Sequence, residues 1–143
     1  MNDTLKIVVP LTPPSQNHYM CYRVATIHGK PQVIAYPAKE AKVWWRTVEA
    51  HSAGMKLDAD AYEIAYVVYQ GPNERGDVDN YGKCLLDSLV KSGVIDRDHK
   101  VIAIHGYKAR DRENPRTEIF IRAQGQLSLL DLPMPTVAEV ENW

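Results

Sequence analysis

Residues 62–101 of this 143-residue chain read YEIAYVVYQGPNERGDVDNYGKCLLDSLVKSGVIDRDHKV, and this stretch decides the fold. Tyr62–Tyr69 is rich in aromatic and β-branched residues, which predicts a strand. Asn80–Ser92 has its leucines on one side, which predicts a helix that packs on a sheet, and Gly93 is placed to end it. A further strand is predicted to start at Val101. A helix between two strands indicates a layered protein with a helix against a sheet.

The flanking segments supply more strands and a second helix. The expected elements are a strand at Lys6–Leu11 that Pro10 makes an edge strand or ends early, a hairpin at Arg23–Ile27 and Gln32–Tyr36, a helix starting at Pro37, and a closing pair of strands at Val101–Lys108 and Thr117–Arg122. The sequence therefore predicts an α+β fold, a two-layer sandwich in which two main helices lie on one face of a mixed β-sheet.

Composition excludes several classes of protein. Two cysteines are too few for a disulfide scaffold or a four-cysteine zinc site. No apolar run reaches the roughly 18–20 residues of a membrane span, and the N-terminus lacks the pattern of a secretory signal, so we expect a cytoplasmic protein without a membrane partner. All 17 Lys and Arg residues fall within residues 1–122, against 15 acidic residues there, which permits binding to nucleic acid.

Acidic residues gather around the predicted helix. Asp77 and Asp79 are two residues apart, so extended backbone would turn both carboxylates to one side. Asp79, Lys83 and Asp87 are spaced by four and would share one helix face. Asp98 follows the helix and regains the Asp77 end only if the chain folds straight back, or a partner subunit contributes it.

A bound cation would stabilise such a cluster of carboxylates and could take part in catalysis. Converging carboxylates repel one another, and a hard cation with oxygen ligands, Mg²⁺ or alternatively Mn²⁺, removes that penalty. A metal of this kind can orient a water and neutralise a phosphodiester oxygen. Lys83 is placed one turn from Asp79, where it can contact the scissile phosphate.

A structural interpretation of the same residues stays open. Asp is a common N-cap, so Asp77 or Asp79 can serve only to start the helix. Asp87 and Asp96 can be solvated surface residues.

Rival sites fit the spacing poorly. A calcium loop starting at Asp77 has Tyr81 at its fifth position and Ser88 at its twelfth, where it needs ligands. Zinc bound by His99 and His105 lacks further ligands at suitable spacing. Cys84 lies beside leucines and is expected to be a buried thiol.

The window resembles the RusA family of Holliday junction resolvases. The matching pattern is D-x-D-N-x-x-K, then an Asp four residues after the Lys, then a Gly and a spaced Asp before a strand. In this sequence, the residues that match the pattern are Asp77, Asp79, Asn80, Lys83, Asp87, Gly93 and Asp98. Pro13–Tyr19 (PPSQNHY) resembles the family's N-terminal signature, and Lys108 stands where the family has a lysine on the next strand.

The resemblance implies roles for these residues. Asp77, Asp79 and Asp98 would be the metal-binding catalytic carboxylates, and Lys83 the catalytic lysine. The family commonly has two adjacent Asp residues after the Gly, whereas Arg97 separates them here, so Asp96 remains an alternative to Asp98. The resemblance also implies an Mg²⁺-dependent homodimer that nicks opposing strands of a four-way junction.

Three residues are candidate contacts to DNA. Asn17 lies in the N-terminal signature, Arg75 precedes the acidic window, and Lys108 follows it. Gly76 stands directly before Asp77, where the family has a basic residue, so contacts at this edge are expected to differ.

Residues 1–122 are predicted to form the nuclease domain and residues 123–143 a flexible tail. The tail contains QLSLLDL at Gln126–Leu132, which resembles the bacterial sliding-clamp-binding peptide. An extended peptide of this kind places apolar side chains in a groove, while a glutamine makes polar contacts. The alternative is that the segment packs on its own domain or dimer partner. The candidate clamp contacts are Gln126, Leu127, Leu129 and Leu130.

Taken together, the sequence predicts an Mg²⁺-dependent endonuclease that resolves branched DNA in the nucleoid of a bacterium, encoded by the host or a prophage. Two alternatives remain. One is a non-catalytic branched-DNA-binding module tethered to the replication clamp, and the other is a different metal-dependent phosphodiesterase.

Overall fold

The computed structural model describes residues 4–15 and 18–124. The candidate DNA contact Asn17 and the candidate clamp-binding residues Gln126, Leu127, Leu129 and Leu130 lie outside this range. The elements are, in order, β1 (Thr4–Val9), β2 (Met20–Ile27), β3 (Lys30–Pro37), α1 (Lys39–His51), β4 (Ala61–Gln70), the 3₁₀ turn η2 (Val78–Asn80), α2 (Gly82–Lys91), the 3₁₀ turn η3 (Asp98–Lys100), β5 (Val101–Arg110) and β6 (Arg116–Gln124).

Four strands form a mixed sheet in the order β1-β6-β4-β5. Strand β4 runs antiparallel to β6 and parallel to β5, and β1 is an edge strand that ends at Val9, before Pro10. Both predicted closing strands form, as β5 and β6, but the expectation that they pair is wrong, because they flank β4. The reason lies in β4, which is buried along nearly its whole length and therefore takes a central place.

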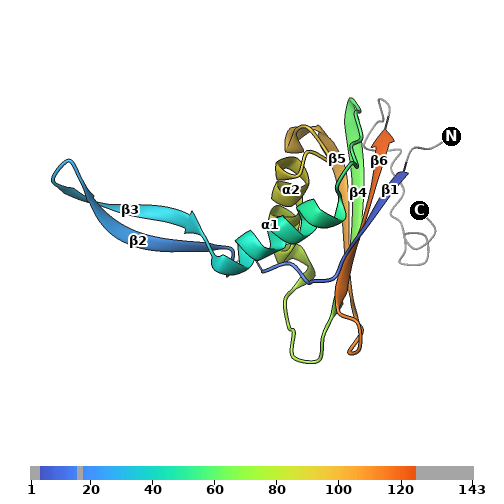
Figure 1. Cartoon of the computed structure of the whole chain (residues 1–143), viewed down its shortest axis with the longest axis horizontal. Coiled ribbons are helices and arrows are strands. Elements are labelled where there is room, and N and C mark those ends of the chain that lie inside the picture. The colour runs from blue at the N-terminus through green and yellow to red at the C-terminus, as the bar shows by residue number, and fades with distance from the viewer. Residues whose placement is uncertain (1–3, 16–17, 125–143) are drawn as a thin grey trace.

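Both helices cover the same face of the sheet, which confirms the predicted α+β fold (Figure 1). The core between the two layers includes Ile7, Trp44, Ile64, Leu85 and Ile119. A smaller apolar cluster, built on Ala65, Val67 and Phe120, lies on the other face. Within the described residues, neither helix is long and apolar enough to cross a bilayer.

Both helices begin two residues later than expected. Pro37 is the last residue of β3, where it pairs with Met20, and Ala38 is the N-cap of α1 in extended conformation. Helix α2 begins at Gly82 because the preceding residues form the 3₁₀ turn η2. It ends as predicted, since Gly93 has a positive φ of 78°.

Strands β2 and β3 form a hairpin of their own, which projects from the body (Figure 1). Its turn has two residues with positive φ, His28 at 52° and Gly29 at 76°. This is the backbone of a type I′ turn, whose twist suits two antiparallel strands.

Candidate functional site

Side chains from the ends of two strands tie down the loop that leads from β4 to η2. Gln70 at the end of β4 donates from Nε2 to the carbonyl of Gly76 at 2.7 Å and to the Tyr81 hydroxyl at 2.8 Å. Arg110 at the end of β5 donates to the carbonyl of Gly71 at 2.7 Å. Because both ends of the loop are bonded to strands, the residues that follow it have a defined position.

The 3₁₀ turn η2 rests on the middle of the sheet. The Tyr66 hydroxyl donates to the carbonyl of Val78 at 2.7 Å, and Gly106 on β5 lies beneath both residues. Burial, with the nearby charge of Asp79 next in size, raises the pKa of Tyr66 to about 12. Tyr66 therefore stays protonated and remains a donor at neutral pH, close to the Asp79 carboxylate.

Asp77 and Asp79 serve no capping role. Asp77 precedes η2 and Tyr81 precedes α2, and neither position has a side-chain cap bond. The capping alternative is therefore not realised. The expectation of extended backbone is also wrong for Asp79, which lies within the 3₁₀ turn because the loop is pulled down onto the sheet.

Two lysines flank these carboxylates. Lys108 Nζ lies 3.9 Å from Asp77 Oδ1 and donates to the carbonyl of Gly76 at 3.4 Å. Lys83, on the first turn of α2, has a side chain that is 62% exposed and lies 3.7 Å from Asp87 Oδ2. The Asp77 side chain is itself 74% exposed, so this end of α2 presents charges of both signs to solvent.

Asp87 anchors the N-terminal segment to α2. It accepts a hydrogen bond of 2.6 Å from the Tyr19 hydroxyl. Burial and the bond to Asp87 raise the pKa of Tyr19 well above its usual value, so the hydroxyl remains a donor. Asp87 thereby links the loop before β2 to the helix that carries Lys83.

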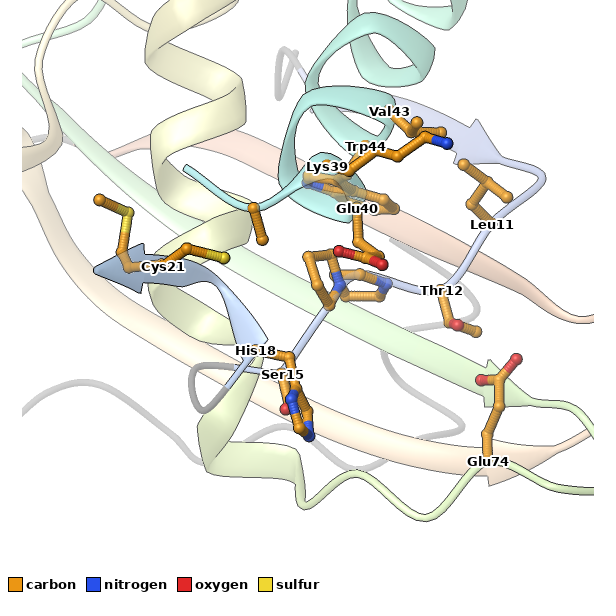
Figure 2. Close-up of a pocket in the computed structure, with 14 residues that line it drawn as sticks. Leu11, Thr12, Ser15, His18, Cys21, Lys39, Glu40, Val43, Trp44 and Glu74 are labelled. Atoms are coloured by element: carbon orange, nitrogen blue, oxygen red, sulfur yellow. The ribbon is translucent and has the colours of Figure 1, made fainter. Parts of the chain in front are cut away.

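Two adjoining cavities separate the N-terminal loop from the Asp77 loop. The first has about 400 Å³ and is bordered by Gly76, Asp77 and Asn80. The second has about 870 Å³ and extends to α1, with Glu40 and Glu74 on different walls (Figure 2). Thr12, Pro13, Ser15, His18 and Glu74 line both. The N-terminal signature and the acidic window therefore border one continuous depression.

Asp98 lies at the opposite end of α2. It opens η3, directly before Val101, the residue at which β5 starts and pairs with β4. Gly106, which faces η2, is five residues further along β5, a rise of about 17 Å. Within the described residues, no three His, Cys, Asp or Glu side chains are close enough to hold one metal ion. One chain therefore brings Asp77 and Asp79 to one end of α2 and leaves Asp98 at the other.

Asp96 is engaged by its neighbours, unlike Asp98. Lys100 Nζ lies 2.7 Å from Asp96 Oδ2, and the Tyr62 hydroxyl lies 3.0 Å from Oδ1. These two donors lower the pKa of Asp96 to about 2. Asp98 is exposed at the start of its turn.

Comparison with known proteins identifies the family. The model of the family described as "Endodeoxyribonuclease RusA" matches residues 22–122. The chain is 31% identical over 111 residues to "Crossover junction endodeoxyribonuclease RusA" of Aquifex aeolicus (strain VF5), covering 76% of this chain and 82% of that protein. The chain belongs to the RusA family. The match includes both ends of α2, all of β4 and β5, and β6 as far as residue 122.

The rival sites do not form in this RusA-family protein. His105 is bonded to Glu63 at 3.0 Å inside the protein, which leaves it unsuited to a zinc site with His99. Burial, with a smaller effect from Asp87, raises the pKa of the Cys84 thiol far above neutral, so it is unreactive.

The sequence analysis missed the residues that position this candidate site, namely Gln70, Tyr66, Gly106 and Arg110. A signal was present for one of them, because a glycine inside a strand often marks a close approach of another segment. A Cβ on Gly106 would lie 2.5 Å from the Tyr66 hydroxyl oxygen. The unexpected Gly76 has a similar reason, since a Cβ there would overlap the Tyr81 hydroxyl.

Proposed function

We propose that this RusA-family protein is a metal-dependent, structure-selective endonuclease that resolves four-way DNA junctions by paired nicks and acts as a homodimer. The observation that carries the proposal is the pair Asp77 and Asp79, which have no capping role and lie on the end of α2 flanked by Lys83 and Lys108. The name of the Aquifex relative, a crossover junction endodeoxyribonuclease, supports the choice of substrate.

The donor set suits a hard divalent cation. Asp77 and Asp79 offer exposed carboxylate oxygens, and Mg²⁺ and Mn²⁺ prefer oxygen ligands of this kind. We propose that Asp77, Asp79 and Asp98 hold the ion. When bound, it would activate a water and stabilise negative charge on the phosphodiester.

We propose that Asp98 of the partner subunit completes each site. The carboxylates of one chain lie at opposite ends of α2, so an antiparallel pairing of two such helices about a two-fold axis would bring Asp98 of one chain to Asp79 of the other. Apolar side chains near α2 support such a contact. Leu86 and Val90 are partly buried, and Ile104 on the edge strand β5 is 42% exposed.

Lysine and arginine side chains around the carboxylates are proposed to bind DNA. Lys83 is held by Asp87 and would contact the scissile phosphate, where it stabilises the charge that develops during cleavage. Arg75 and Lys108 flank Asp77 and would bind the phosphate backbone, together with Asn17.

The test compares labelled four-way junction, linear duplex and single strand, each with and without Mg²⁺. We expect paired nicks confined to the junction and dependent on the metal. Tight junction binding without cleavage in Mg²⁺ or Mn²⁺ would instead favour a binding module. Equal cleavage of all three substrates would favour a general phosphodiesterase.

We also propose that Gln126–Leu132 binds the bacterial sliding clamp. The support is the sequence pattern, in which Leu127, Leu129 and Leu130 would fill an apolar groove and Gln126 would make polar contacts. A synthetic peptide of this segment is expected to bind a clamp weakly, because an unstructured peptide loses entropy on ordering. Replacing both Gln126 and Leu129 with Ala should abolish binding. No binding of the unaltered peptide at high micromolar concentration would contradict the proposal.

A further inference from the structure

The β2–β3 hairpin, residues Met20–Pro37, is an arm that contacts the body of its own chain at its base, where Met20 packs against the core. Within the described residues, its two strands pair only with each other and do not join the four-stranded sheet. Figure 1 shows the arm extending away from both helices. An isolated two-stranded hairpin is marginally stable in water at best. Another surface would therefore stabilise the part of the arm that lies beyond its base.

The two faces of the arm differ in chemistry. The register puts Val24 opposite Val33 and Tyr22 opposite Ala35, and all eight residues of their face are uncharged. Three of these side chains are strongly exposed, Tyr22 at 68%, Val24 at 71% and Val33 at 70%. The uncharged face consists of Met20, Tyr22, Val24, Thr26, Pro31, Val33, Ala35 and Pro37. Both basic residues of the strands, Arg23 and Lys30, lie on the opposite face.

A contiguous apolar patch of this kind is typical of a protein interface. Nucleic acid is a poor occupant for the uncharged face, since binding to the phosphate backbone depends on lysine and arginine. Val24 and Val33 form a direct cross-strand pair, so their side chains lie next to each other and form one apolar surface.

The arm leaves the body beside α2. Tyr19, the residue before β2, donates its hydroxyl to Asp87 in the middle of that helix. Its carbonyl accepts a 2.9 Å hydrogen bond from the amide of Ala38, and its ring meets Trp45 edge-on with centroids 5.8 Å apart. Both strands of the arm are therefore fixed at their base next to the helix that carries Lys83.

We infer that the uncharged face of the arm packs on a second copy of this chain, so that two copies exchange arms. The inference rests on the proposed function only in that a junction resolvase working by paired nicks needs two copies. A two-fold axis near α2 would let each arm reach its partner, because the arm starts there.

The area of the uncharged face is large enough for an interface with a second copy of the chain. Eight residues of strand extend about 26 Å and two strands are about 10 Å wide, so one face offers roughly 260 Å². Two arms and the two surfaces that receive them would bury about 1,000 Å², near the lower limit for a specific interface. Contacts along α2 would add to this area.

The test is the variant Val24→Glu with Val33→Glu, measured by sedimentation equilibrium of the full chain over a wide concentration range. The matched control is Ala25→Glu with Gln32→Glu, a cross-strand pair on the opposite face that carries the same added charge. We expect dimers for the unaltered chain and the control, and a dimer dissociation constant at least about 100-fold higher for the valine variant. Circular dichroism should show the same folded core in all three.

Several outcomes would overturn the inference. These are a monomeric unaltered chain at about 100 μM, an unchanged dimer in the valine variant, or equal weakening in the control. An unchanged dimer that loses only junction binding would assign the face to DNA. If the valine variant fails to fold, Val24→Thr with Val33→Thr is measured in the same way and must weaken the dimer. Junction cleavage by the unaltered chain is measured separately. The failure of the arm-exchange proposal can therefore be distinguished from the failure of the proposed nuclease function.

Discussion

At each end of α2, side-chain hydrogen bonds fix the local structure beside exposed carboxylates. At the N-terminal end, Gln70 and Tyr66 hold the backbone that carries Asp77 and Asp79, while those carboxylates have no capping bond. At the C-terminal end, Tyr62 and Lys100 bond to Asp96, while Asp98 stays exposed two residues later.

Carboxylates that accept short hydrogen bonds from side chains of their own chain are expected to have structural roles, and the carboxylates without such bonds are expected to have chemical ones. Asp87 and Asp96 are engaged by tyrosine hydroxyls and lysines of their own chain, so they stabilise the fold. Asp77, Asp79 and Asp98 are exposed and remain available to a cation. The comparison predicts that replacing Asp with Asn lowers the cleavage rate in the second group and lowers the stability of the fold in the first.

The largest effect is expected for Asp79→Asn and for Asp77→Asn. Each should lower the rate of junction cleavage by at least about 10²–10³-fold, because a proposed ligand to the metal would be lost. Junction binding should persist or tighten, since a negative charge near phosphate is removed. Single-turnover cleavage and thermal unfolding measure the two effects, with Asp58→Asn as an exposed control. Cleavage within tenfold of the unaltered protein for both variants would refute the assignment.

Lys83→Ala tests the proposed role of the lysine at the N-terminal end of α2. We expect cleavage to fall by about 100-fold, and by more than junction affinity, because the lysine would act on charge that develops in the transition state. Lys56→Ala, which removes an exposed lysine of another loop, is the control. Equal losses of affinity and rate would reduce Lys83 to a binding residue.

Gly106→Ala tests the support beneath η2. Its Cβ would lie 2.5 Å from the Tyr66 hydroxyl oxygen and 3.1 Å from Val78 Cγ2, so the turn that carries Asp79 must shift. A misplacement near 1 Å can cost up to about 100-fold in rate, and we expect a loss of about tenfold here. Tyr66→Phe removes only one hydrogen bond and should cost less. Unchanged cleavage by the alanine variant would show that the position of η2 is unimportant.

Asp96→Asn should change stability while leaving cleavage largely intact. The folded pKa of about 2 lies below the unfolded value of about 3.9. The stabilisation is therefore present above pH 4 and is lost as the pH falls from about 4 to 2. The variant should melt at a lower temperature than the unaltered protein at pH 7, and the gap should close toward pH 2. A variant that keeps its stability but loses cleavage would make Asp96 the metal ligand.

Local signals predicted much of the fold. The β-branched run of β4 and the one-sided leucines of α2 predicted these elements, and Gly93 predicted where α2 ends. The pairing of β5 and β6 with β4 was not predictable from adjacent strands, because it depends on which strand is buried on both faces.

The candidate site was predictable only in part. The spacing of Asp77, Asp79 and Lys83 was sufficient to place them at one end of a helix. The supporting contacts of Gln70 and Arg110 join residues distant in sequence, so no local pattern marks them. The position of Asp98 depends on the length of α2 and the direction of β5, which only the folded chain fixes.

A mixed dimer tests the central claim, that each site takes Asp77 and Asp79 from one chain and Asp98 from the other. Asp79→Asn and Asp98→Asn chains carrying different affinity tags are co-expressed, and the dimer with one of each is purified. If Asp98 acts across the dimer, one of the two sites is intact, so nicking of a four-way junction should recover to about half the unaltered rate, while both parent homodimers stay inactive. If all three ligands come from one chain, both sites carry a substitution, and an inactive mixed dimer would contradict the account.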